Sequence, residues 1–169
     1  MSTKSNFTKE QVYDIILKWT EEKAKQAEIV FDPTFCGGYV RYKTTELTAV
    51  IPDNSDGKLG GWKRPDHYAY EVGCGTTILN LLLSFSYTNM SDTSKRICDE
   101  LLKKYKMTPK YDSADFDDNF YRLCVFDISI KECQREDDIR KAMDKLFYRM
   151  KGYEEFIIYK LKEAGIVQQ

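Results

Sequence analysis

At 169 residues the chain has the length of one domain, and we expect residues 1–169 to form one. Hydrophobic side chains make up 42% of the sequence and aromatic ones 14%, a composition that favours a packed core over disorder. The 26 basic and 27 acidic side chains give a net charge of −1, which excludes a global attraction to nucleic acid or anionic membranes. No signal peptide precedes the first helical pattern, and no apolar stretch is long enough to span a bilayer. We therefore expect a soluble, cytoplasmic protein.

The first predicted element is a helix that begins after Thr8. Thr8 and Gln11 have the spacing of a capping box, in which each side chain satisfies the other residue's backbone N–H. The apolar stripe of this helix consists of Val12, Ile15, Ile16 and Trp19. The pattern fades near Glu28, and Pro33 discourages its continuation. Residues 1–37 are therefore predicted to be an N-terminal helix and a linker.

A short strand is predicted over residues 39–43, with Arg41 and Lys43 on one face. Residues 44–50 have the pattern of a single helical turn capped by a threonine. The segment 52–66 is rich in Gly, Asp, Asn and Pro and is predicted to be a long loop.

Two amphipathic strands follow the loop, joined by a glycine-containing turn at residues 73–76. One face of the first strand consists of Tyr68, Tyr70, Val72 and Cys74. The core face of the second strand consists of Leu79, Leu81, Leu83, Phe85 and Tyr87. The alternation predicts a hairpin with one buried face.

The rest of the chain is predicted to be helix, strand and helix. A helix capped by Ser91 or Asp92 ends before Pro109, and a strand runs over about 120–130. A long helix begins near Asp137, and Gly152 is a potential kink or break within it. Short connections between neighbouring strands favour an α+β fold. Its mainly antiparallel four-stranded sheet would be packed by an N-terminal helix, a middle helix and the long C-terminal helix.

The sequence contains no complete catalytic constellation. His67 is the one histidine, it is expected on a loop or at the surface, and no Gly-x-Ser-x-Gly elbow occurs. The glycine-containing segments 57–61 and 73–77 lack the spacing of phosphate-binding loops, so we predict turns there. The five cysteines are widely spaced and form no Cys-x-x-Cys pair, which predicts reduced, mainly buried thiols. We predict no enzyme activity and no cofactor.

Metal-dependent nuclease sites place an acidic residue at the start of a strand, and Asp53 or Asp66, each of which follows a proline, could supply it. After Asp66, Gly73 occupies the position where such a site needs lysine, two residues beyond Glu71. The acidic segment 111–118 could crowd oxygen ligands around Ca²⁺, but it lacks the EF-hand register. We predict no metal site, and interpret the acidic segment as a solvated loop or a contact for a basic partner.

One constellation remains as a candidate binding site. It consists of Arg41, Lys43, Trp62, Lys63 and Arg64. Guanidinium groups beside planar aromatic side chains can grip phosphate or stack on bases. A structural interpretation stays open, in which Arg41 pairs with Glu46 or Glu71 and Trp62 fills an edge of the core.

The motifs from residue 38 to residue 163 resemble a known region. They are VRYKTTEL at 40–47, Ile-Pro at 51–52, Gly-Gly-Trp at 60–62 and YAYEV at 68–72. This order resembles the C-terminal, non-catalytic region of bacterial proteins of the PD-(D/E)XK nuclease superfamily. Tyr42 stands where that pattern has Phe, and Gly60 where it has Ser. The catalytic half of those proteins lies upstream of the matched region, so the resemblance implies a binding module without the active residues.

Three functional hypotheses stay open from the sequence. The leading one is a non-enzymatic recognition module of a bacterial or phage nuclease-associated, defence-related system, binding a protein or nucleic acid. The alternative is a phage-type inhibitor or sponge protein that binds a host immune protein or a small signalling ligand. The third is an enzyme with an unrecognised site. No membrane partner is expected, and the oligomeric state stays open, a homo-oligomer included.

Overall fold

A computed structural model describes residues 6–107 and 120–168. Within these residues a four-stranded sheet has the strand order β1-β2-β3-β4, and each neighbouring pair is antiparallel. The strands are β1 (Val40–Tyr42), β2 (Tyr68–Cys74), β3 (Ile78–Ser86) and β4 (Phe120–Ser129). The helical elements are α1 (Lys9–Lys25), η1 (Pro33–Phe35), α2 (Thr45–Val50), α3 (Asp92–Tyr105) and α4 (Glu136–Glu163). The predicted α+β class with a mainly antiparallel sheet is confirmed.

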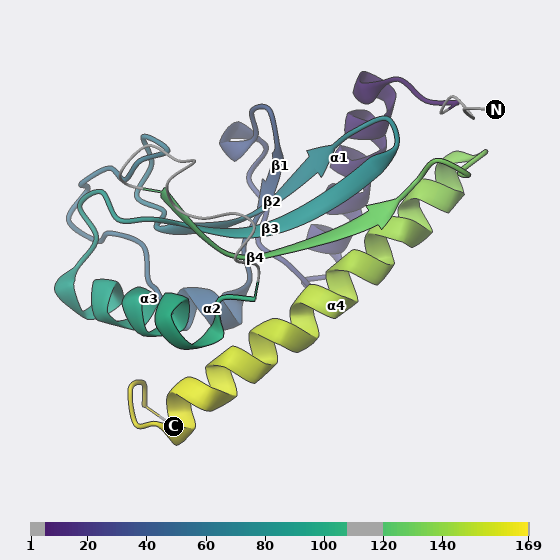
Figure 1. Cartoon of the computed structure of the whole chain (residues 1–169). Coiled ribbons are helices and arrows are strands. Elements are labelled where there is room, and N and C mark those ends of the chain that lie inside the picture. The colour runs from purple at the N-terminus through teal and green to yellow at the C-terminus, as the bar shows by residue number, and fades with distance from the viewer. Residues whose placement is uncertain (1–5, 108–119, 169) are drawn as a thin grey trace.

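Two helices cover one face of the sheet. α1 packs against β1 and β2, and α4 packs against β3, β4 and α1. Figure 1 shows α4 running the length of the sheet, with α2 and α3 gathered at the end where α4 finishes. In the described part of the chain, no helix is long and apolar enough to cross a membrane.

The helix ends follow the predicted caps. The Thr8 hydroxyl accepts from the Gln11 N–H at 3.2 Å, and the Gln11 side chain accepts from the Thr8 N–H at 2.8 Å. The apolar stripe of α1 is buried against the sheet. α4 is continuous through Gly152, so the potential break does not occur there. Gly165 has a φ of 68°, the left-handed conformation that ends many helices.

The predicted core faces of β2 and β3 are buried, but Tyr87 lies beyond β3 and is half-buried. The expectation of one buried face is wrong, because Ala69, Leu82 and Ser84 on the other face are buried as well. The buried residues of the predicted core faces include Tyr68, Tyr70, Val72, Cys74, Leu79, Leu81, Leu83 and Phe85. Tyr42 of β1 stacks on Tyr70 of β2 with ring centroids 5.1 Å apart. An unpredicted carboxyl, Glu154 of α4, is only 2% exposed and accepts hydrogen bonds from the Thr44 hydroxyl (2.7 Å) and from the Tyr70 hydroxyl. Because a buried charge is costly, ionisation of the Glu154 carboxyl is expected to destabilise the core.

All five cysteines are free thiols. Cys74, Cys98 and Cys124 are buried, whereas Cys36 and Cys133 are half-buried, which confirms the predicted reduced and mainly buried state. Burial raises the pKa of Cys74 and of Cys124 to about 12. The buried thiols therefore stay protonated at neutral pH and act as small apolar side chains. The predicted acidic segment at 111–118 lies outside the described residues.

Candidate functional site

The structure distributes the five predicted binding residues over separate environments. Lys43 and Arg64 lie together in one charge network, whereas Arg41 belongs to a second ion pair. Trp62 packs among aromatic rings, and the Lys63 side chain is exposed. Of the five predicted residues, the structure therefore brings only Lys43 and Arg64 into one network.

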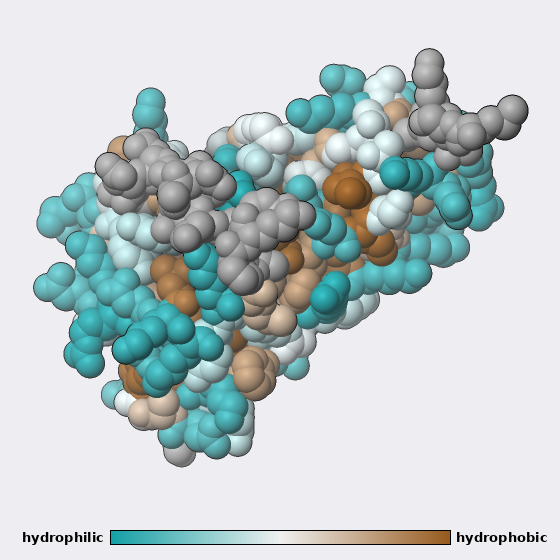
Figure 2. Space-filling view, in the orientation of Figure 1, coloured by the Kyte–Doolittle hydropathy of each residue, from teal (hydrophilic) through white to brown (hydrophobic). Residues whose placement is uncertain are grey.

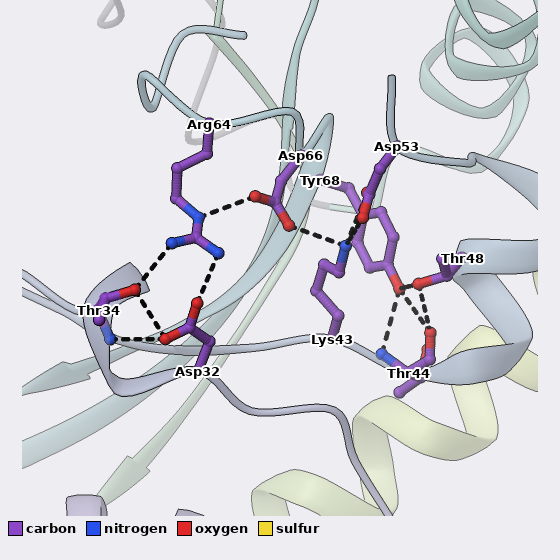
Figure 3. Close-up of polar contacts among 9 residues, drawn as sticks. All are labelled: Asp32, Thr34, Lys43, Thr44, Thr48, Asp53, Arg64, Asp66 and Tyr68. Carbon is purple, nitrogen blue, oxygen red and sulfur yellow. Dashed lines mark hydrogen bonds and ion pairs between the residues drawn. The ribbon is translucent and has the colours of Figure 1, made fainter. Parts of the chain in front are cut away.

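Asp66 is the centre of the charge network drawn in Figure 3. One of its carboxylate oxygens lies 2.8 Å from Lys43 Nζ, and the other accepts from Arg64 Nε at 2.9 Å. Lys43 also lies 2.6 Å from the Asp53 carboxylate. The Lys43 ammonium group therefore lies between two carboxylates, one near the beginning and one near the end of the segment that joins α2 to β2.

On the side away from Lys43, the network reaches Asp32, the residue that caps the beginning of η1. Arg64 donates to the Asp32 carboxylate at 2.7 Å and to the Thr34 hydroxyl at 2.9 Å, so all three guanidinium nitrogens are engaged. Asp32 also accepts from the backbone N–H of Thr34 at 2.9 Å. Asp-Pro-Thr is a recognisable N-terminal cap pattern, but nothing local in the sequence identifies Arg64 as its partner.

The two aspartates are held in their charged form. The Thr34 hydroxyl and N–H, together with Arg64, lower the pKa of Asp32 to about 2. Burial acts to raise the pKa of Asp66, but the hydrogen bonds from Lys43 and Arg64 outweigh it, and the pKa lies below its usual range. Both carboxylates are therefore ionised at neutral pH. With Asp53, the network has three carboxylates against the two cations Lys43 and Arg64, an excess of one negative charge.

Arg41 forms the second ion pair, with Glu71 on the neighbouring strand. Arg41 Nε donates to Glu71 at 2.7 Å, and the Ser84 hydroxyl donates to the other carboxylate oxygen at 2.8 Å. A second guanidinium nitrogen donates to the Phe35 carbonyl at 3.1 Å. One of the two pairings considered for Arg41 in the structural interpretation is therefore the one observed.

An aromatic group lies beside both charge clusters. The Phe35 ring lies 4.8 Å from the Arg64 guanidinium and 5.6 Å from that of Arg41. Trp62 packs edge-on against Phe35 and Phe120, with centroid distances of 5.7 and 5.0 Å. Phe35 was missed in the sequence because an isolated phenylalanine after a proline turn has no distinguishing pattern.

The 52–66 loop is closed at its base. The Asn54 N–H donates to the Pro65 carbonyl at 3.0 Å. Lys43, from the sheet, joins Asp53 to Asp66 across the same base. Loops of this length without regular structure are uncommon in compact domains and are often functional.

The interior of the loop is braced by its glycines. The Gly60 N–H donates to the Arg64 carbonyl at 2.6 Å, and the Gly61 N–H donates to the Ser86 hydroxyl at 2.8 Å. Leu59, immediately before these glycines, is 51% exposed. The loop therefore holds a large apolar side chain at the surface on a fixed backbone.

His67 is buried, and the prediction of a loop or surface position is wrong. Its side chain is 1% exposed, and Nδ1 donates to the Ser86 carbonyl at 3.1 Å. Among the described residues Nε2 has no hydrogen-bond partner. The prediction failed because His67 contacts Ser86, which also accepts from Gly61 of the loop, and local sequence cannot show these contacts.

The acidic residues considered for nuclease chemistry are neutralised by basic side chains. Asp53 and Asp66 share Lys43, and Glu71 pairs with Arg41. Within residues 6–107 and 120–168, no group of three or more His, Cys, Asp or Glu side chains is placed to hold a metal ion.

Fold and site together define a small α+β protein in which a cluster of ion pairs braces a long surface loop. No family model, curated protein or solved structure matches the chain. The resemblance to the C-terminal region of PD-(D/E)XK nuclease superfamily proteins therefore stays a prediction.

Proposed function

We propose that this protein is a non-enzymatic binding module that recognises another protein through the exposed part of the 52–66 loop. The observation that supports this proposal is the closed base of the loop, where Lys43 joins Asp53 to Asp66. A loop ordered before binding loses little conformational entropy when a partner docks, so more of the contact energy appears as affinity. Leu59 and Lys63 are among the exposed side chains that it presents, with Ser55, Asp56 and Lys58.

The hydrogen bonds that Arg41 and Arg64 already make favour a protein partner over nucleic acid. All three guanidinium nitrogens of Arg64 are already engaged, and Arg41 is paired with Glu71. A phosphate would have to displace these carboxylates, and bidentate phosphate recognition needs a free guanidinium fork. The loop itself carries three acidic and three basic residues, which are Asp53, Asp56, Asp66, Lys58, Lys63 and Arg64. Its charge therefore gives no net attraction to a polyanion.

A binding role is also favoured over catalysis. Nucleophilic catalysis by a serine or cysteine needs a base within reach of substrate, and the His67 side chain is only 1% exposed. The sequence resemblance suggests the biological setting, which we propose to be a bacterial or phage nuclease-associated, defence-related system in the cytoplasm.

The test is an affinity capture from nuclease-treated bacterial lysate with the tagged full chain. We expect a protein to be retained by the wild type and by Lys103→Asn, which removes an exposed cation on α3 far along the chain. We expect Leu59→Glu and Lys63→Asn to lose that protein. Asparagine is chosen because residue 63 has a φ of 57°, which asparagine tolerates.

Two results would contradict the proposal. One is equal retention of the captured protein by the wild type and both loop variants. The other is direct binding of purified protein to duplex DNA or to RNA with an affinity that falls steeply as salt increases, because that dependence is the signature of counterion release.

A further inference from the structure

The side of α4 that faces away from the sheet is open. Figure 1 shows no described helix or strand beyond it. Exposed residues recur there at spacings of three, four and seven, which places them on one face of the helix. This face, the outer stripe of α4, consists of Lys145, Tyr148, Arg149, Gly152, Phe156 and Tyr159.

Three aromatic rings of the outer stripe are exposed. Tyr148, Phe156 and Tyr159 are 55, 46 and 60% exposed. Tyr148 and Phe156 each touch a neighbouring helix on one side, through Lys23 and Tyr105, and are open to solvent on the other. Along the line that α4 follows in Figure 1, Figure 2 shows brown and pale surface between the teal of charged side chains. Single exposed apolar residues are ordinary, but several on one helix face indicate a surface that packs against a partner.

Gly152 lies at the centre of the outer stripe, where the fold itself does not require a glycine. Residue 152 is helical and lacks the positive φ that favours glycine. A Cβ there would meet no described atom within 4 Å, so no neighbour in this part of the chain excludes a side chain. Glycine in a helix interior is destabilising relative to alanine. At a contact between two helices, however, the lack of a side chain lets the two axes approach closely.

The two cations of the outer stripe form no ion pair with any described residue. Lys145 and Arg149 are both exposed, and Arg149 lies over the Phe126 ring at 4.0 Å. Other cations of α4, by contrast, are paired with carboxylates. Both unpaired cations lie in the first half of the stripe, and the rings of Phe156 and Tyr159 lie in the second half. A cation over an aromatic face is attracted to it, so the stripe is complementary to itself when turned end for end.

We propose that the outer stripe of α4 is the contact between two copies of this chain, whose α4 helices pack antiparallel across a two-fold axis at Gly152. In such a contact, a residue before Gly152 lies level with the residue equally far after Gly152 in the second copy. Tyr148 therefore lies level with Phe156 of the second copy, which forms an aromatic pair. Lys145 lies level with Tyr159 of the second copy, and Arg149 lies about one residue's rise from its Phe156, which forms two cation–ring pairs.

A parallel pairing of the two helices fits less well. It would set Lys145 beside Lys145 of the second copy and Arg149 beside Arg149, and like charges repel. The outer stripe spans about 21 Å at 1.5 Å per residue. A single helix pair of this length is at the small end of specific interfaces, which bury roughly 1,200–2,000 Å², so we expect a weak, concentration-dependent dimer. The stripe includes no residue of the 52–66 loop, and the inference does not depend on the proposed function.

The test is sedimentation equilibrium of the full chain over a wide range of protein concentration. We expect the wild type to pass from monomer to dimer as concentration rises. Gly152→Gln places a long side chain at the two-fold axis and should stay monomeric, while its fold is kept because glutamine is a good helix former. Lys103→Gln, on the exposed side of α3, is the control and should dimerise as the wild type does. A wild type that stays monomeric throughout, or a dimer that Gly152→Gln leaves unchanged, overturns the proposal.

A paired charge exchange tests the antiparallel register. Lys145→Glu should weaken dimerisation because it removes the cation–ring pair, and Tyr159→Lys should weaken it because it sets a second cation level with Lys145. The double variant Lys145→Glu/Tyr159→Lys should dimerise again, because opposite charges then lie level with each other. In a parallel dimer the double variant would set like charges together. A double variant that dimerises no better than the weaker single variant therefore overturns the proposed register.

Discussion

Lys43 Nζ lies 2.8 Å from the Asp66 carboxylate, and the two side chains are only 8% and 6% exposed. This pair joins the residue after β1 to the end of the 52–66 loop, where Asp53 and Arg64 extend the ion-pair network. Removing one partner of a buried ion pair leaves the other charge without compensation, which costs more than the pair itself contributes.

The Lys43→Met variant is therefore expected to be strongly destabilised. Arg64 continues to neutralise Asp66, so we expect the lower end of the range for broken buried pairs, about 3 kcal/mol of unfolding free energy. Urea unfolding at neutral pH measures the change. Lys58→Met is the control, because the Lys58–Asp56 pair is exposed and its loss should cost less than about 1 kcal/mol. Equal effects of the two variants would rule out a structural role for the buried pair.

Local patterns in the sequence were sufficient to predict most elements of the fold. The Thr8–Gln11 capping box depends on neighbours within a few residues and is present in the structure. The same holds for the threonine cap of α2, where Thr44 accepts from the Leu47 N–H. The predicted core residues from Leu79 to Phe85 are buried as well, but Leu82 and Ser84 between them are also buried, because both faces of β3 are covered there. Helix caps and the side-chain alternation of strands are set by backbone geometry, so they can be predicted without knowledge of the tertiary fold.

The site was less predictable because its partners are far apart in the sequence. Arg64 contacts Asp32, which precedes it by 32 residues, and a solvated surface cation has the same local sequence as this engaged one. His67 is buried for a similar reason, since its ring contacts the carbonyl of Ser86, 19 residues further along the chain. Hydrophobic periodicity shows which face of a strand is buried, but it does not show which long-range charges meet.

Gly152 offers a stabilising substitution. It lies inside the continuous helix α4, and a Cβ added there would meet no atom within 4 Å. Gly152→Ala is expected to raise the free energy of unfolding by about 0.5–1 kcal/mol, because alanine has less backbone entropy to lose in a helix. Thermal or urea unfolding measures it. Gly165→Ala should have the opposite sign, because residue 165 has a φ of 68°; stabilisation by both variants would refute this account.

Gly61 is required by close packing of the 52–66 loop. A Cβ at this position would lie 2.5 Å from the Phe120 ring and 2.6 Å from the Ser86 hydroxyl. Gly61→Ala is expected to lower the free energy of unfolding by about 1–3 kcal/mol through overpacking. Gly38→Ala is the control, because its Cβ would meet no atom within 4 Å. The double variant Gly61→Ala/Phe120→Ala should lose less stability than the sum of its single variants; strict additivity in urea unfolding would show that the ring is not the obstacle.

The contribution of Glu154 to stability is expected to depend on pH in the opposite sense to those of Asp32 and Asp66, whose pKa values are lowered. Burial raises the pKa of Glu154 above its usual 4.5, although the hydrogen bonds from Tyr70 and Thr44 act in the other direction. The folded state therefore keeps this proton to a higher pH than the unfolded chain does. The stabilising contribution is complete below the unfolded pKa and is lost as pH rises through the folded pKa.

Glu154→Gln removes the carboxyl that must ionise in the core while keeping an oxygen that accepts from Tyr70 and Thr44. The variant should gain stability relative to wild type as pH rises from about 4.5 through the raised folded pKa, after which the difference is constant. Urea unfolding from acid to neutral pH measures this difference. Glu155→Gln, which neutralises an exposed carboxylate one residue along α4, is the matched control and should run parallel to wild type. A difference between Glu154→Gln and wild type that does not change with pH would mean that Glu154 ionises equally readily in the folded and unfolded chains.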